Sequence, residues 1–252
     1  MIPEIDVTPQ DMEETIREVG EDLLSYSAAI VLLPGANANP DDAIENGTVG
    51  FFIQSGMEMM ITAAHVITSF NTYREDHPEA VLILGGSGAV LDITDHHVIS
   101  LDEKVDIATC ILPNSVSLSA IGKKFFDISH RPMPNVKRGE PVGFVGFPGE
   151  HRREENGNLN LYFTSVVLDV SSSSERHFIL VDEDLSRTYF AFDEKSEKLT
   201  SIGGMSGAPA FVSRNGKYEF AGILYEGDKK ESMMFISHSS FIQDDGTIQH
   251  NL

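Results

Sequence analysis

The sequence predicts an all-β protein built from two antiparallel β-barrels and preceded by one N-terminal helix. Short runs of β-branched and aromatic residues recur along most of the 252-residue chain, with turn-forming residues between them. The runs fall into two sets, separated by a segment of little strand character at residues 113–138. Regularly spaced strands with almost no helices are typical of sandwiches and barrels, and two similar sets favour two barrels.

The helix is predicted before the first strand. Thr8 can cap a helix, Pro9 suits the first helical position, and acidic residues follow in the first turn. Apolar residues then recur at helical spacing as far as Leu23. We therefore expect residues 1–26 to form a helical extension that packs on the body through one face.

The expected strands follow in chain order. Those of the first barrel, within residues 27–120, are 27–33, 48–54, 57–63, 81–84, 89–100 and 105–112. Those of the second barrel, within residues 135–252, are 141–147, 159–170, 177–181, 188–192, 208–213, 218–225 and 232–238. The dipeptide Asn46-Gly47 is interpreted as one of the turns between them.

Composition limits the partners and the compartment. The 18 basic residues against 39 acidic ones give a formal charge of −21, which opposes binding to nucleic acid or an anionic membrane surface. No apolar run is long enough to span a membrane, and the first residues carry acids where a signal peptide needs bases. Cys110 is the single cysteine, so no intrachain disulfide can form. We expect a cytoplasmic protein, and the sequence predicts no oligomeric state.

One stretch presents a serine on a tight turn. Residues 203–209 read Gly-Gly-Met-Ser-Gly-Ala-Pro, so Ser206 is bracketed by glycines that permit unusual backbone angles and a close approach of substrate. In such a turn the N–H groups of Gly204 and Ser206 could converge on one point and stabilise an oxyanion.

Two further segments offer a base and an acid for this serine. His65 directly follows an apolar strand, and Asp106 is expected inside another apolar strand, where a carboxylate needs a hydrogen-bond donor. Neutral imidazole is basic near pH 7 and can take a proton from Ser206, while Asp106 orients the imidazole and stabilises its charged form. The chain therefore supplies His65, Asp106 and Ser206 as a candidate catalytic triad.

The segments TAAHV, DIA and GMSGAP, in this order, resemble those of the chymotrypsin/trypsin-like serine proteases. The resemblance implies one domain over residues 1–252 with two six-stranded β-barrels and the active site between them. It also implies an endopeptidase that acts on polypeptides through an acyl-enzyme and uses no cofactor or metal. Absent cysteines near the histidine make the chain more similar to bacterial or viral branches.

The resemblance also predicts where substrate binds and where this chain departs. Tyr225 and Gly227 correspond to the strand that pairs with an extended substrate, and Thr200 to the base of the primary specificity pocket. Because Thr200 carries no charge, we expect preference for a neutral, small or medium apolar side chain. Tyr225 stands where many members have a serine that contacts the triad aspartate. Met205 stands where the animal digestive branch has an aspartate that pairs with a freed N-terminus, so this activation switch should be absent.

The sequence is also compatible with functions other than constitutive proteolysis. The protein could be a protease-fold binding module with an idle site, or a latent protease gated by a regulatory protein through residues 8–25 or 171–176. Asp92, Asp95, His96 and His97 could suggest a metal site, but neighbouring strand residues point to opposite faces, so a solvated strand end is favoured. Cys110 is expected to be a core residue without chemistry.

Overall fold

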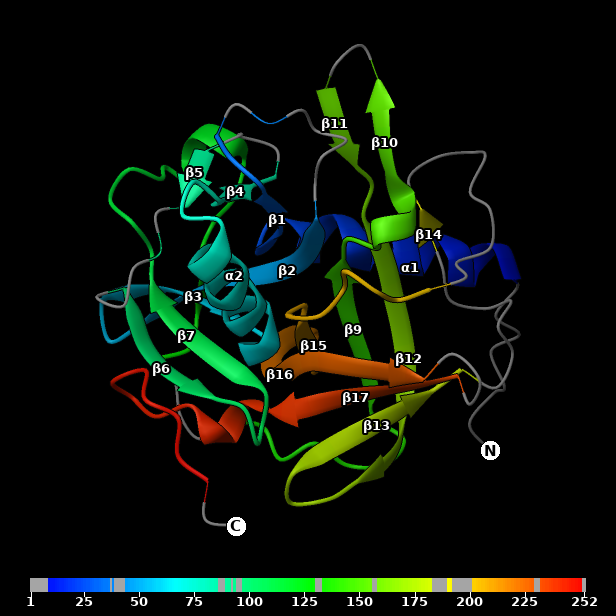
Figure 1. Cartoon of the computed structure of the whole chain (residues 1–252). Helices are drawn as coiled ribbons and strands as arrows, with labels where there is room; N and C mark the ends of the chain where they lie inside the picture. The colour runs from blue at the N-terminus through cyan, green and yellow to red at the C-terminus, as the bar shows by residue number, and fades with distance from the viewer. Residues whose placement is uncertain are drawn as a thin grey trace, which may run out of the picture.

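The computed structural model confirms the predicted fold class (Figure 1). It describes residues 9–36, 38, 44–85, 89–91, 93, 97–129, 133–155, 158–182, 190–191, 201–228 and 232–250. The described strands form two large sheets, antiparallel except for the pairing of β2 with β8, and the N-terminal helix is present. One sheet closes into a barrel and the other is curled into a half-barrel, which is the chymotrypsin-like arrangement with a difference in closure.

The first sheet has eight strands in the order β5-β4-β1-β2-β3-β7-β6, with β8 parallel to β2. Among the described strands, β5 and β6 are its edges. Its strands are β1 (Ser27–Leu33), β2 (Glu45–Gln54), β3 (Met57–Thr62), β4 (Val81–Leu84), β5 (Ala89–Leu91), β6 (Val98–Asp102), β7 (Ile107–Ile111) and β8 (Phe126–Asp127).

The second sheet has seven strands in the order β13-β17-β16-β15-β9-β12-β14. Because β13 also pairs with β12, the six strands from β13 to β12 close into a barrel. Its strands are β9 (Pro141–Gly146), β12 (Thr164–Ser173), β13 (His177–Val181), β14 (Phe190–Ala191), β15 (Pro209–Arg214), β16 (Lys217–Asp228) and β17 (Met233–His238). A separate hairpin of β10 (Arg152–Glu155) and β11 (Asn158–Leu161) stands at the top of Figure 1.

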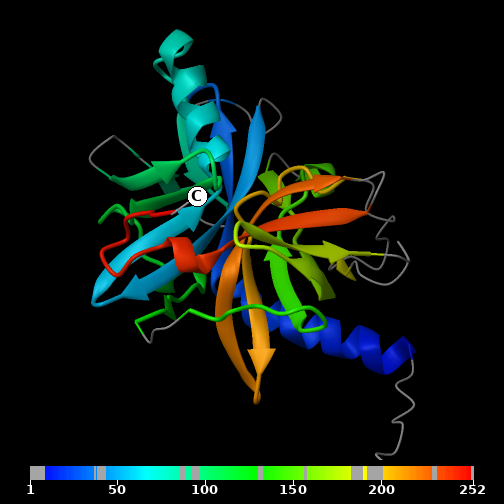
Figure 2. The same cartoon turned by 90° about the horizontal axis from the view of Figure 1, so that it is seen from below.

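Two α-helices accompany the sheets. The N-terminal helix α1 (Pro9–Leu24) packs on β9 and β12 of the second barrel, and it runs along that side of the molecule in Figure 2. Gly20 and Ser165 are in close contact there, and Ser165 Oγ donates a hydrogen bond of 2.9 Å to Ile16 O. Helix α2 (Ala64–Asp76) follows β3 and buries Ile67 and Phe70 against the first sheet. Short 3₁₀ turns cover Ser119–Ile121, Gly149–His151 and Ser239–Phe241.

Several elements differ from the sequence prediction. Helix α2, hairpin strand β10 and strand β8 were not predicted, because their apolar periodicity is weak or they are very short. The expected strands 89–100 and 159–170 each cover parts of two strands. Asn46-Gly47 lies inside β2 and is not a turn. The side chains of Asp92, Asp95 and His96 lie outside the described residues.

An aromatic cluster joins the two sheets. Phe52 of β2 lies 4.3 Å (ring centroids) from Phe220 of β16 and 6.5 Å from Phe211 of β15. All three rings are buried, so apolar burial fixes the two sheets against each other. In the described part of the chain, no helix is long and apolar enough to cross a membrane.

Candidate active site

His65 lies in the first turn of α2, one residue past the start of the helix. Ala63, which precedes the helix, offers no side-chain cap, so the N–H groups of the first turn need a hydrogen-bond acceptor from elsewhere. Asp106 Oδ1 supplies it by accepting from His65 N at 2.8 Å. The apolar strand β3 and the helix start therefore place the His65 side chain at the cleft, where it is 47% exposed.

Asp106 lies in the turn between β6 and β7, not inside a strand as predicted. Its φ of +52° lies in the left-handed region, which aspartate tolerates better than most residues. Asp102 Oδ1 shapes the turn by accepting from Lys104 N at 2.8 Å. Two residues of the second barrel also hold it: Ser237 Oγ donates to Val105 O, and Arg176 donates to Lys104 O.

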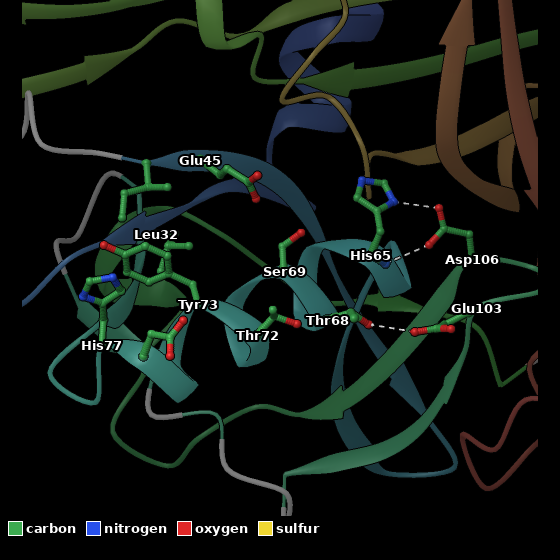
Figure 3. A pocket seen from close by; sticks show the side chains of 12 residues that line it. Leu32, Glu45, His65, Thr68, Ser69, Thr72, Tyr73, His77, Glu103 and Asp106 are labelled. Carbon is green, nitrogen blue, oxygen red and sulfur yellow. Dashed lines mark hydrogen bonds and ion pairs between the residues drawn. The ribbon is translucent and has the colours of Figure 1, made fainter.

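The two side chains form a direct pair. His65 Nδ1 lies 2.7 Å from Asp106 Oδ2, as the dashed lines of Figure 3 show. This hydrogen bond raises the pKa of His65 above its usual value of 6.5. Partial burial opposes the rise, while the charges of Asp106, Glu45 and Glu226 add to it. Because Nδ1 donates to the carboxylate, Nε2 of the neutral ring is the free basic atom.

Ser206 occupies a turn just before β15, with Gly204 and Gly207 both at φ +92°. A Cβ on Gly207 would lie 2.0 Å from Thr48 O, so only glycine fits where the turn passes β2. Thr48 N donates to Ser206 O at 2.8 Å. Ser206 Oγ lies 3.5 Å from Tyr225 O, and among the described residues it has no hydrogen bond to His65.

Two N–H groups of the turn are without acceptors. In the part of the chain that the structure describes, neither Gly204 N nor Ser206 N donates a hydrogen bond to the protein. The preceding carbonyl, Gly203 O, accepts from Gly149 N at 2.8 Å. Because the C=O and N–H of a trans peptide point in opposite directions, Gly204 N–H points away from Gly149. Both free donors therefore remain available to an oxyanion.

The serine and the histidine line one cavity of about 500 Å³ between the sheets. The first sheet and α2 contribute Glu45 and His65, and the facing loops contribute Gly149, Gly204 and Ser206. A second cavity of about 580 Å³ extends along α2 and is shown in Figure 3. Glu45 and His65 line both cavities, so the two meet beside the imidazole.

The residues predicted to bind substrate have different outcomes. Thr200 lies outside the described residues. Tyr225 presents its carbonyl to Ser206, but its hydroxyl lies 3.3 Å from His177 Nδ1 and does not support Asp106. Gly227 faces Ile202, whose Cδ1 would lie 1.5 Å from a Cβ added there. Ile202 therefore fills the space beside the predicted substrate-binding strand.

Sequence reasoning missed the residues that hold the serine turn from the other sheet. The sequence predicts a turn at Asn46 and a strand at Thr48, and nothing in their local pattern indicates contact with residues a hundred or more positions later.

Cys110 is buried, and burial raises the pKa of its thiol to about 12, which agrees with its expected place as a core residue without chemistry. In the described residues, no cluster of three or more His, Cys, Asp or Glu side chains is placed to hold a metal.

Comparison with known proteins gives distant structural likeness. No family model and no curated protein matches the chain. The Rv3671c protease of M. tuberculosis in its active form is 19% identical, with a TM-score of 0.49, over 94% of this chain and 85% of that one. The thermostable serine protease AL20 from an extremophilic microorganism is 11% identical, with a TM-score of 0.49, over 85% of this chain and 91% of that one. By fold, the chain has the chymotrypsin-like arrangement of two packed β-sheets, one of which is a closed six-stranded barrel.

Proposed function

We propose that the protein is a serine endopeptidase that hydrolyses polypeptides through an acyl-enzyme on Ser206. The observation that carries the proposal is the double hydrogen bond of Asp106 to His65, beside a cavity that His65 shares with Ser206. A carboxylate that orients an imidazole next to a glycine-bracketed serine has the geometry of nucleophilic catalysis.

In the first step, His65 Nε2 takes the proton of Ser206 Oγ while Oγ bonds to the substrate carbonyl carbon. The carbonyl oxygen becomes negative and is stabilised by the free N–H groups of Gly204 and Ser206. Asp106 keeps Nδ1 protonated and stabilises the imidazolium through the 2.7 Å hydrogen bond. The C–N bond then breaks, and the imidazolium gives its proton to the leaving amine.

In the second step, water replaces the amine and the roles repeat. His65 takes a proton from the water as its oxygen attacks the acyl carbon, and the same N–H groups stabilise the second oxyanion. Collapse breaks the bond to Ser206 Oγ, which regains its proton from His65. The protonation states of Ser206 and His65 are restored, because the original serine proton leaves with the amine and a proton from water replaces it; neither a cofactor nor a metal is required by this scheme.

The preferred residue at the cleavage site is proposed to be neutral and small. Ile202 fills the space facing Gly227, which follows two residues after Tyr225, whose carbonyl oxygen lies 3.5 Å from Ser206 Oγ. A large side chain next to the attacked carbonyl would have to displace Ile202. This narrows the small or medium apolar preference expected from the sequence.

A second candidate is a partner-gated or idle binding module with the same fold. The contact of Ser206 Oγ with Tyr225 O, in place of one with His65, favours it. A polypeptide would then bind in the cavity without turnover until a regulatory protein reoriented the serine. Turnover by the purified chain distinguishes the two candidates.

The test uses a fluorophosphonate probe, which reacts with activated serines, together with a peptide-library digest. We expect the wild type to be labelled at Ser206 and to cleave peptides, and Ser206→Ala and His65→Ala to lose both signals. Ser213→Ala, which changes an exposed serine of β15, serves as the matched control and should behave as wild type. Equal labelling of the wild type and Ser206→Ala would refute the proposal.

A further inference from the structure

The turn that carries Ser206 has an uncharged residue, Met205, at the position where an aspartate would be needed to pair with a freed N-terminus. The Met205 side chain is fully buried and packs on Gly146 of β9, where an added Cβ would lie 2.8 Å from Met205 Cβ. An apolar residue there cannot bind a charged N-terminus. The conformation of residues 203–207, here called the oxyanion loop, must therefore be held by other contacts.

Thr48 of β2 makes two hydrogen bonds to this loop and a third to Phe147, at the end of β9. Its Oγ1 donates to Gly204 O at 3.1 Å and accepts from Phe147 N at 3.2 Å. Its backbone N donates to Ser206 O at 2.8 Å. The side chain is completely buried, so water cannot replace these partners. Thr48 thus binds the carbonyl oxygens at both ends of the Gly204–Ser206 segment.

Thr48 is itself fixed in the first sheet. Thr62 Oγ1, at the end of β3, donates to Thr48 O at 2.7 Å. Thr62 lies three residues before His65, so the strand pair that holds the loop also leads into the helix that carries the base. The strand pair β2–β3 therefore fixes the positions of both Ser206 and His65.

Asn46, two residues earlier on the same strand, holds the other side of the loop. Its Nδ2 donates to Phe147 O at 2.7 Å. A Cβ on Gly204 would lie 2.2 Å from this nitrogen, and one on Gly149 would lie 2.9 Å from Asn46 Oδ1. Asn46 therefore lies beside both Gly149 and Gly204, where Gly149 N donates to Gly203 O and so directs the N–H of Gly204 away from Gly149.

We propose that Thr48 and Asn46 are positioning residues that hold the oxyanion loop in its competent conformation. The competent conformation of the oxyanion loop is then fixed by contacts with β2, and requires neither a freed N-terminus nor a partner. This inference rests on the proposed function for its catalytic consequence. The hydrogen bonds of Thr48 to the loop are direct, whereas α1 packs on Gly143 of β9, the strand whose Gly146 contacts Met205 of the loop.

The experiment compares Thr48→Val, which removes the hydroxyl at nearly constant volume, with Thr48→Ser, which keeps it. Ser165→Ala is the matched control, because it removes another buried hydroxyl, the one that binds α1. Two readouts are taken on each full-length protein: backbone hydrogen exchange of a peptide covering residues 203–208, and the rates of fluorophosphonate labelling and peptide cleavage.

For Thr48→Val we expect exchange in the loop to accelerate at least tenfold, and labelling and kcat to fall by roughly 10- to 100-fold with little change in KM, since the oxyanion donors are misplaced. Thr48→Ser should restore most of both, and Ser165→Ala should change neither. The acid limb of the pH profile should stay in place in Thr48→Val, because the His65–Asp106 pair is untouched.

Loop exchange in Thr48→Val that matches wild type would overturn the inference, whatever the activity. The inference would also be overturned if Thr48→Val accelerated loop exchange but kept its labelling rate within twofold of wild type. An equal loss of labelling in Ser165→Ala would overturn it as well. If the wild type is neither labelled nor active, the proposed function fails, while the exchange comparison still decides whether Thr48 holds the loop.

Discussion

The two halves of the candidate site are assembled in different ways. His65 and Asp106 both come from the first sheet and bind each other directly through two hydrogen bonds. Ser206 comes from the second barrel, has no hydrogen bond to His65 among the described residues, and is oriented by β2 of the first sheet. The acid and the base are therefore joined directly to each other, although Ser237 and Arg176 of the second barrel also hold the Asp106 turn. The nucleophile has no such direct partner and is oriented by contacts between the two sheets.

Because the acid–base pair and the serine are held by different contacts, mutations at the two places should change different properties of the site. Disturbing the pair alters the protonation chemistry of His65 without moving the oxyanion loop. Disturbing the interface between β2 and the loop alters the placement of Ser206 and its neighbouring N–H groups without changing the pKa of His65.

The largest effect is expected for Asp106→Asn. The neutral amide removes the charge that stabilises the imidazolium and disturbs the tautomer, so kcat should fall by roughly 10⁴-fold, as in the Ser-His-Asp template. Catalysis requires neutral His65, and the pKa of His65 is raised in the wild type, so activity should be half lost at a pH above 6.5 as pH falls. In Asp106→Asn this acid limb should move to lower pH.

A pH profile of kcat/KM for both proteins checks this prediction. Asp102→Asn provides a comparison within the same hairpin, since Asp102 shapes the turn but makes no hydrogen bond to the imidazole of His65. An acid limb that stays at the same pH in Asp106→Asn would show that Asp106 does not control the charge of His65.

A smaller but still large effect is expected at the interface itself. Gly207→Ala would place a Cβ 2.0 Å from Thr48 O at a φ of +92°, combining backbone strain with overpacking. We expect a loss of unfolding free energy on the order of 2–6 kcal/mol and loss of labelling, with the remaining folded protein showing a displaced loop.

Gly216→Ala is the matched control for Gly207→Ala. Gly216 also has positive φ, +70°, but an added Cβ would meet nothing within 4 Å. It should cost only about 1 kcal/mol, measured by urea unfolding, and leave labelling intact. Equal losses for the two glycines would show that backbone angle alone, and not the approach of β2, explains the requirement for Gly207.

The sequence predicted the parts of the site that carry strong local signals. Gly203–Pro209, the apolar strand before His65 and the N-terminal helix each have a pattern that local physics explains. The curled, unclosed first sheet and the placement of Asp106 in a turn were missed, since pairing at edges and a single positive φ leave little trace in sequence. The role of Thr48 was missed because its partner, Gly204, is 156 residues away.

The smallest effect is expected at Ile202, which affects substrate choice and not chemistry. Its side chain fills the space facing Gly227, so Ile202→Ala should open room beside the attacked carbonyl. We expect kcat/KM for peptides with leucine at that position to rise about tenfold relative to peptides with alanine, while labelling by a small fluorophosphonate stays near wild type. Ile202→Val should give an intermediate preference. A peptide-library profile that is the same in all three proteins would mean that the space beside Gly227 does not receive the substrate side chain, and that the nucleophile's half of the site selects substrate through another surface.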